Sequence, residues 1–267
     1  MHSRPEFSLI QAMITETFDG KSPAIINPQI SDGLPEFDAC IVTFSDRIAE
    51  AVAEEFGRKK IASFWFATGE TPVYQLELDG RKFAFYRTYV GAPACVGTVE
   101  DSLSVIRTKK YVVFGGAGCL DREIARGKIM VPTEAYRDEG TSYHYAPASD
   151  YIKIRNSQKI AEFMRKNGLP FVEGRTWTTD AFYRETKNNF EARKADGCIS
   201  VEMECAALQA VCDFRGLELY VFLTGGDLLD APEWDARMAF RNSGAKGTQH
   251  DTGHFDIALE LARFVTE

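Results

Sequence analysis

The chain lacks several features that would place it in other classes of protein. None of its apolar stretches approaches the roughly 20 residues that a membrane helix needs, and its polar start, MHSRPEFS, lacks the apolar segment of a signal peptide. It has no long basic run, and 31 basic against 39 acidic side chains give a formal net charge of -8. We therefore expect a cytoplasmic protein that binds neither a membrane nor a nucleic-acid polymer.

Cysteine and histidine do not occur in the spacing that metal sites or disulfide frameworks show. The six cysteines are widely separated, no CxxC pair is present, and the chain has only four histidines. Structural zinc sites need closely spaced pairs of such residues. We expect no metal and reduced thiols in the core at Cys40, Cys95, Cys119, Cys198, Cys205 and Cys212.

Internal repeats, low-complexity tracts and linkers are also absent from the body of the chain. Residues 1–35 carry turn signals and weak periodicity, so they predict an irregular N-terminal arm. Over residues 36–267, short apolar runs such as DACIVTF and KYVVFGG alternate with amphipathic stretches such as RIAEAVAEEFG. This alternation predicts one α/β domain in which helices cover a largely parallel sheet. Ligands of such a sheet bind beyond the carboxyl ends of its strands.

Two glutamates lie where a predicted strand meets a predicted helix, in the stretch VEMECAAL at residues 201–208. Residues Cys198 to Val201 read as strand, and Cys205 to Arg215 read as helix. Alternate side chains of an extended segment share a face, so Glu202 and Glu204 can point into one cleft and accept hydrogen bonds from sugar hydroxyls. The alternative is that Glu202 belongs to the first helical turn and Glu204 is solvated.

VEMECAAL is very similar to the ribose-binding signature of the nucleoside phosphorylase superfamily, which includes purine nucleoside phosphorylases, uridine phosphorylases and related nucleosidases. Other segments resemble the family in the same order along residues 38–267. They are KYVVFGGAGCL for the phosphate-side strand, DEGTSYHYAP for a segment typical of uridine phosphorylases, WTTDAFYRET for the base site and TGGD for an acid-bearing strand end. The resemblance implies a single-domain, three-layer α/β/α fold with a central mixed sheet. It also implies a homo-oligomer (dimer, trimer or hexamer) that uses inorganic phosphate and no other cofactor.

The resemblance further implies roles for individual residues of the ribose and base sites. Glu204 would accept hydrogen bonds from the ribose hydroxyls, and its charge would stabilise the cation that develops on the sugar. Met203 would lie against the sugar, and Glu202 would complete this ribose-binding group and shape the turn. Phe182 matches the family's base-stacking aromatic residue, with Tyr183 beside it in the base site. The alternative for Phe182 is a core aromatic.

Asp227 ends the apolar strand LELYVFLTGG and matches an aspartate that protonates the leaving base in purine-cleaving members. Uridine-cleaving members use a Gln and Arg pair instead, and the stretch 184–188, RETKN, lacks that Gln-x-Arg pattern. YHYAP favours the uridine branch, whereas Asp227 favours the purine branch. We give Asp227 more weight because it would take part in the chemistry. The alternative is a loop aspartate that caps the next turn.

The phosphate site departs from the family pattern. Phosphorylases usually have Gly-Asp-Pro-x-Arg after the first strand, whereas TFSDR at residues 43–47 keeps only the arginine. Val113 stands where the family has a phosphate-binding arginine, although backbone N–H groups of the following glycine turn can form an anion nest. Arg47, Gly115 and Gly116 are therefore the predicted phosphate contacts, and the alternative for Arg47 is a surface residue. The charge could instead come from residues that spacing does not rank, namely Lys59, Lys60, Arg87 and Arg107.

The sequence thus predicts a pentosyltransferase of nucleoside salvage that cleaves the N-glycosidic bond of a nucleoside with phosphate. Its products would be the free base and ribose 1-phosphate, with purine nucleosides slightly favoured over uridine. Two alternatives remain open. A nucleosidase that uses water is favoured by Val113, and a nucleoside-binding protein with weakened catalysis is favoured by the incomplete phosphate motif.

Overall fold

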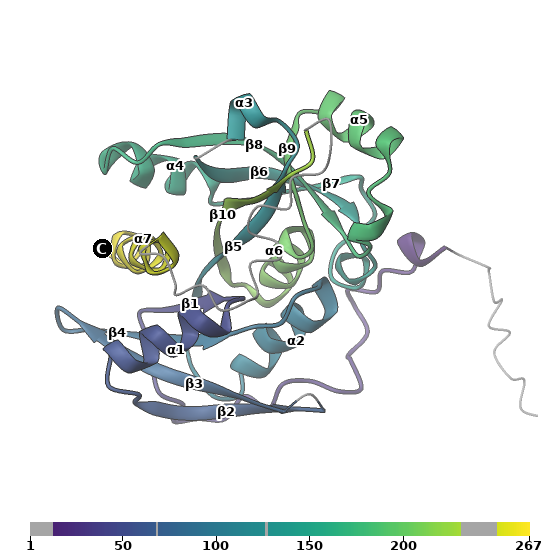
Figure 1. Ribbon diagram of the computed structural model, residues 1–267. Helices are drawn as coiled ribbons and strands as arrows, with labels where there is room; N and C mark the ends of the chain where they lie inside the picture. Colours follow the sequence, from purple (N-terminus) through teal and green to yellow (C-terminus); the bar gives the residue numbers. More distant parts are fainter. Residues whose placement is uncertain (1–12, 68, 126–127, 231–249) are drawn as a thin grey trace, which may run out of the picture.

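A computed structural model of the chain describes residues 13–67, 69–125, 128–230 and 250–267, and it shows a sheet covered by helices on both faces (Figure 1). The strands are β1 (Ala39–Thr43), β2 (Lys60–Phe66), β3 (Gly69–Leu78), β4 (Arg81–Arg87), β5 (Lys110–Cys119), β6 (Ile129–Asp138), β7 (Tyr151–Lys153), β8 (Phe171–Thr179), β9 (Cys198–Glu202) and β10 (Glu218–Leu228). The α-helices are α1 (Asp46–Glu55), α2 (Ala92–Ser102), α3 (Arg122–Ala125), α4 (Ser157–Lys166), α5 (Lys187–Ala195), α6 (Cys205–Arg215) and α7 (His250–Val265). Short 3₁₀ turns are η1 (Ile14–Glu16), η2 (Thr141–His144) and η3 (Phe182–Arg184).

The sheet is mixed, as the family resemblance implies. Its strand order is β10-β6-β8-β9-β5-β1-β4-β3-β2, with β7 on β6, and β10 also pairs with β5, so that five of the strands close into a ring. Strand β1 pairs in parallel with β4 and with β5, and β5 pairs in parallel with β10. Strands β2, β3 and β4 pair antiparallel, as do β5 with β9 and β6 with β10.

The expectation of a largely parallel sheet, drawn from the alternation of apolar and amphipathic runs, holds within β4-β1-β5-β10 and β6-β8-β9 but fails from β2 to β4. The segment between β2 and β4 forms antiparallel hairpins, not a helical crossover. Its second turn is Asp79-Gly80, and both residues have positive φ, 50° and 78°. A two-residue Asp-Gly turn with positive φ at both positions matches the twist of a hairpin. This local signal was present in the sequence at residues 79–80.

Two apolar layers separate the sheet from its helices. On one face α1, α4 and α7 pack through residues such as Val52, Phe163 and Phe255. On the other face α2 and α6 pack through residues such as Val96 and Val211. The three-layer α/β/α architecture is therefore confirmed. All six cysteines are free and buried, as predicted.

The strand and helix predicted around VEMECAAL are confirmed as β9 and α6. Gly216 ends α6 with φ 67°, a left-handed conformation that glycine adopts without steric cost. Of the predicted arm at 1–35, residues 13–35 carry only the short η1, and residues 1–12 lie outside the described part. The boundary at residue 36 stays a prediction.

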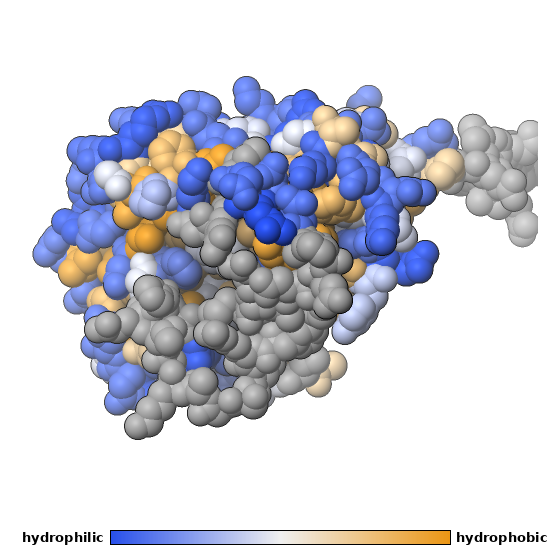
Figure 2. All heavy atoms as spheres, turned by 45° about the horizontal axis from the view of Figure 1, so that its top comes forward, coloured by the Kyte–Doolittle hydropathy of each residue, from blue (hydrophilic) through white to orange (hydrophobic). Residues whose placement is uncertain are grey.

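The described surface is mostly hydrophilic on the face that Figure 2 shows, with apolar residues in smaller separate areas. This distribution agrees with the ordinary charged fraction of the chain, 26% of its residues. Within the described ranges, no helix combines the length and apolar character needed to cross a membrane.

Candidate functional site

Both glutamates of VEMECAAL are buried at the junction of β9 and α6. Glu202 is the last residue of β9 and is 6% exposed, while Glu204 immediately precedes α6 and is 8% exposed. The alternative of a solvated Glu204 is therefore wrong. Two carboxylates this close and this buried need hydrogen-bond donors, and each has its own set.

The donors to Glu202 come from the surrounding chain. Thr178 Oγ1 donates to its Oε1 at 2.5 Å, and the backbone N–H groups of Glu204 and Cys205 donate to its Oε2 at 2.7 and 2.6 Å. Burial raises the pKa of Glu202, and these hydrogen bonds oppose that shift because they favour the ionised form. Glu202 thus satisfies the first N–H groups of α6 and fixes the turn. Its contact with ribose stays a prediction.

Glu204 faces a loop that is distant in sequence. The backbone N–H of Gly91 donates to Glu204 Oε1 at 2.6 Å, and that of Met203 donates to Oε2 at 3.3 Å. Burial, together with the negative charge of Glu202, raises the pKa of Glu204 to about 8. A ligand with hydroxyl donors, or one with positive charge, would favour its ionised form.

Gly91 was not among the predicted site residues. It precedes α2 with φ 99°, a conformation that a side chain rarely allows. The only sequence signal is a glycine followed by Ala92 and Pro93, which is typical of a helix start. Nothing local indicates that its N–H meets a glutamate 113 residues away.

Two aromatic rings stand exposed at η3, on the predicted base side. Phe182 is 48% and Tyr183 is 79% exposed, and their ring centroids lie 4.1 Å apart. The alternative of a core aromatic for Phe182 is therefore wrong. Large exposed rings are suited to stacking against a planar partner, because contact removes their apolar faces from water.

Asp227 lies near the end of β10, over a glycine of β5. A Cβ added to Gly118 would lie 3.1 Å from Asp227 Oδ1 and 2.9 Å from Val201 Cγ1, so the glycine leaves room for this carboxylate. Val201 pairs with Gly118 and precedes Glu202 in β9. The structure thus brings the predicted base acid beside the strand that carries the ribose glutamates.

A further carboxylate, Glu185, joins Asp227. Burial, and then the negative charge of Asp227, raises the pKa of Glu185 to about 7. In the sequence, Glu185 is noted only as part of the stretch RETKN, which lacks the Gln-x-Arg pattern. Its position beside Asp227 was not predicted. Its position after the aromatic pair of η3 was the available signal.

Of the predicted phosphate residues, Arg47 lies in α1 just after β1, and Gly115 and Gly116 lie within β5. Arg47 is exposed in the first turn of α1. A Cβ added to Gly115 would lie 2.8 Å from the ring of Phe44, whereas one added to Gly116 would meet no atom within 4 Å. Val113 is 1% exposed and packs in the core. Gly116 is therefore the open position, and β5 contributes no charge at residue 113.

The structure separates the four cationic residues that could replace the missing arginine. Lys59 and Lys60 lie at the start of β2, on the outer hairpin. Arg107 precedes β5 and so lies at the amino end of that strand. Arg87 is the last residue of β4 and pairs with Thr43, the last residue of β1. Arg87 is thus the candidate on the predicted edge of the sheet.

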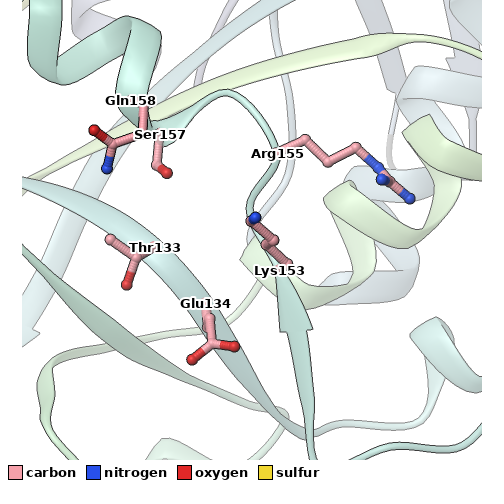
Figure 3. A pocket seen from close by; sticks show the side chains of 6 residues that line it. All are labelled: Thr133, Glu134, Lys153, Arg155, Ser157 and Gln158. Atoms are coloured by element: carbon pink, nitrogen blue, oxygen red, sulfur yellow. The ribbon is translucent and has the colours of Figure 1, made fainter.

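A cavity of about 350 Å³ lies between β6, β7 and the start of α4 (Figure 3). Its lining residues are Thr133, Glu134, Lys153, Arg155, Ser157 and Gln158. Arg155 points toward α6, where its Nε lies 2.5 Å from Asp213 Oδ1. None of the predicted site residues lines this cavity. We therefore locate the candidate site by the buried carboxylates Glu202 and Glu204 and not by this cavity.

Comparisons with known proteins agree with the fold described above. Residues 38–250 match the model of the phosphorylase superfamily. Uridine phosphorylase of Escherichia coli (strain K12) is 26% identical over 55% of this chain and 64% of its own length, so the chain spans less than two thirds of that relative. A DeoD-type purine nucleoside phosphorylase of Yersinia enterocolitica is 23% identical over 75% of this chain and 84% of its own. The crystal structure of an AMP nucleosidase from Bacteroides thetaiotaomicron has a similar fold, with a TM-score of 0.64 and 18% identity over 86% of this chain and 88% of that one.

Proposed function

The chain belongs to the phosphorylase superfamily, and we propose that it cleaves the N-glycosidic bond of a nucleoside with inorganic phosphate as the nucleophile. The observation that carries this proposal is the buried Glu204, whose carboxylate lies at the β9–α6 junction and meets the Gly91 loop at 2.6 Å. Uridine and purine nucleoside phosphorylases among the relatives support the same reaction class.

The proposed reaction uses Glu204 at the sugar. As the glycosidic bond breaks, its electron pair leaves with the base and positive charge develops on the ribose ring. An ionised Glu204 stabilises that charge and accepts hydrogen bonds from the ribose hydroxyls. An oxygen of phosphate then bonds to the anomeric carbon, which gives ribose 1-phosphate and the free base.

The proposed base is a purine held by Phe182 and Tyr183. A purine leaves more easily when a proton is placed on its ring nitrogen, and Asp227 is the group proposed to deliver it. Burial and the negative charge of Asp227 raise the pKa of Glu185 to about 7, so Glu185 is a neighbouring carboxyl group from which Asp227 could receive the proton near neutral pH. The uridine phosphorylase relatives and YHYAP support uridine as the competing substrate.

A second candidate function is nucleoside hydrolysis by water. Val113 is buried in the core, and the ring of Phe44 fills the space beside Gly115, so two elements of the expected phosphate site are apolar here. Both observations favour water over phosphate as the nucleophile.

Base release from inosine, adenosine and uridine, measured with and without phosphate, tests these assignments. Release that requires phosphate supports phosphorolysis, and equal release in both conditions replaces it with hydrolysis. Tight nucleoside binding without release of base would contradict both and indicate a binding protein. A homo-oligomer, a cytoplasmic location and a requirement for no cofactor besides phosphate stay predictions; light scattering of the purified protein tests the first.

A further inference from the structure

Arg87 is placed at the carboxyl edge of the sheet by two strands that run in the same direction. It pairs with Thr43 in the β1–β4 register, and the next residue, Thr88, donates its backbone N–H to Thr43 O at 2.8 Å. Helix α1 begins at Asp46, three residues beyond the end of β1 (Figure 1). The Arg87 side chain therefore lies where β1, β4 and α1 meet.

Neighbouring side chains hold the Arg87 guanidinium in place. Its Nε lies 2.7 Å from Asp46 Oδ1, and its central carbon lies 4.4 Å from the ring centroid of Tyr89. Tyr89 is itself fixed, because its hydroxyl is 2.9 Å from Thr71 Oγ1 and its ring meets Phe66 edge-on at 5.6 Å. A cation that is positioned in advance binds an anion with less loss of side-chain freedom.

The ion pair with Asp46 is weak enough for Arg87 to bind an anion of higher charge, such as a phosphate dianion. The Asp46 side chain is 80% exposed and that of Arg87 is 23% exposed, and an ion pair this solvated contributes no more than about 1 kcal/mol. A guanidinium also has five N–H donors in a flat fork that matches phosphate oxygens. Arg47, the residue after Asp46, is a second arginine in the first turn of α1.

The end of β1 lies between Arg87 and the open glycine of β5. Thr43 pairs with Arg87 on one side and with Phe114 on the other, and Gly116 follows two residues later. Strands separated by one neighbour are about 10 Å apart, so an anion above β1 is within reach of both a long arginine and the Gly116 N–H. The buried Val113 supplies no charge there.

We propose that Arg87 binds a phosphoryl dianion above the end of β1, beside Gly116 of β5, and supplies the charge that Val113 does not. This inference rests on the proposed function for the identity of that dianion. Two sources share the chemistry: inorganic phosphate as the nucleophile, and the 5′-phosphoryl group of a nucleoside monophosphate. The loop that follows Arg87 also carries Gly91, whose N–H donates to Glu204. Residues 88–91 therefore link the proposed anion site to the carboxylate proposed to bind ribose.

Direct binding tests the site without relying on catalysis. Inorganic phosphate and a nucleoside 5′-monophosphate are titrated calorimetrically into wild type, Arg87→Gln, Arg87→Lys and Arg107→Gln. Arg107 is a matched control, since it also forms an exposed ion pair, with Glu36, but lies at the amino end of β5. We expect Arg87→Gln to weaken binding about tenfold or more, Arg87→Lys about threefold, and Arg107→Gln less than twofold.

Equal affinities in Arg87→Gln and Arg107→Gln would overturn the proposal, as would binding of neither anion by the wild type. A thermal unfolding curve for each variant separates loss of binding from loss of fold, and Arg87→Lys keeps the test decisive should Arg87→Gln unfold.

Kinetics then identify the source of the phosphoryl group. If it is the nucleophile, Arg87→Gln raises the phosphate KM about tenfold and leaves the nucleoside KM within twofold. If it belongs to the substrate, the wild type releases base from the monophosphate faster than from the nucleoside without added phosphate, and Arg87→Gln removes that preference. Anion binding that depends on Arg87 in a protein that cleaves neither substrate would refute the proposed function and leave the anion site intact.

Discussion

The ribose end and the phosphate end of the candidate site hold their charged groups in different ways. At the β9–α6 junction both glutamates are buried and accept hydrogen bonds from backbone N–H groups. At the β1–α1 junction the charges of Arg87 and Asp46 sit on side chains that form a partly exposed ion pair. The charges at the first end are therefore held by backbone hydrogen bonds at the strand–helix turn, whereas those at the second end are held by a contact between two side chains.

This difference agrees with the sequence, in which the first end resembles the family's ribose motif and the second departs from its phosphate motif. Loss of a buried carboxylate at the first end would leave backbone donors without partners and disturb α6. At the second end the charge lies on a side chain, so under our proposal Arg87 of β4 supplies the charge that Val113 of β5 lacks while the strand pairing stays the same. The following predictions test that contrast.

Glu204→Gln should have the largest effect on turnover. The amide keeps the shape of the carboxylate and removes its charge, so we expect kcat for nucleoside cleavage to fall roughly 10²- to 10³-fold. Steady-state kinetics check this, with Glu134→Gln as the control because Glu134 pairs with Arg175 outside the site. Near wild-type turnover in a folded Glu204→Gln protein would remove the ribose assignment.

Asp227→Asn should slow purine cleavage by roughly 10²-fold, because the departing base loses its proton donor. A nucleoside whose base leaves readily without protonation should be affected far less. Parallel rates on inosine and on such an activated substrate measure the difference. Equal losses on both substrates, or a wild-type preference for uridine, would contradict the acid role and favour the uridine branch.

The pH dependence should report on Glu204. Its pKa of about 8, raised by burial and by Glu202, means that the ionised form required at the sugar is scarce at pH 7 and predominant at pH 9. We expect kcat/KM to rise about tenfold over that interval, since this parameter follows the free enzyme. A flat profile would show that the charge of Glu204 is not needed.

The same pKa has a consequence for stability with a definite sign. The unfolded chain loses this proton near the ordinary value of 4.5, whereas the folded chain keeps it until about pH 8. Folding therefore becomes less favourable as pH rises between these values. Denaturant unfolding of wild type and Glu204→Gln at pH 5 and pH 8.5 should show a smaller loss for the variant.

Arg47→Ala should have the smallest effect, because the side chain is exposed in the first turn of α1. We expect the phosphate KM to rise about threefold with the nucleoside KM unchanged, less than for Arg87→Gln. An unchanged phosphate KM would show that Arg47 is a surface residue.

Local patterns were enough to predict the elements that carry the ribose end. The period of apolar residues and the Arg215-Gly216 stop predict α6, and both of its bounds are confirmed. The mixed character of the sheet was implied only by resemblance, although Asp79-Gly80 offered a hairpin signal.

The sequence by itself determined the fold class, the strand–helix junction of VEMECAAL and the family, because these depend on short periods and contiguous motifs. Only the tertiary structure shows which residues, distant in the sequence, lie beside the charged groups of the candidate site. Gly91 reaches Glu204 across 113 residues, Glu185 lies near Asp227, and Arg87, not Lys59 or Arg107, lies at the carboxyl edge. These contacts depend on strand order and register, which are set by packing of the whole sheet and not by the residues beside each charge.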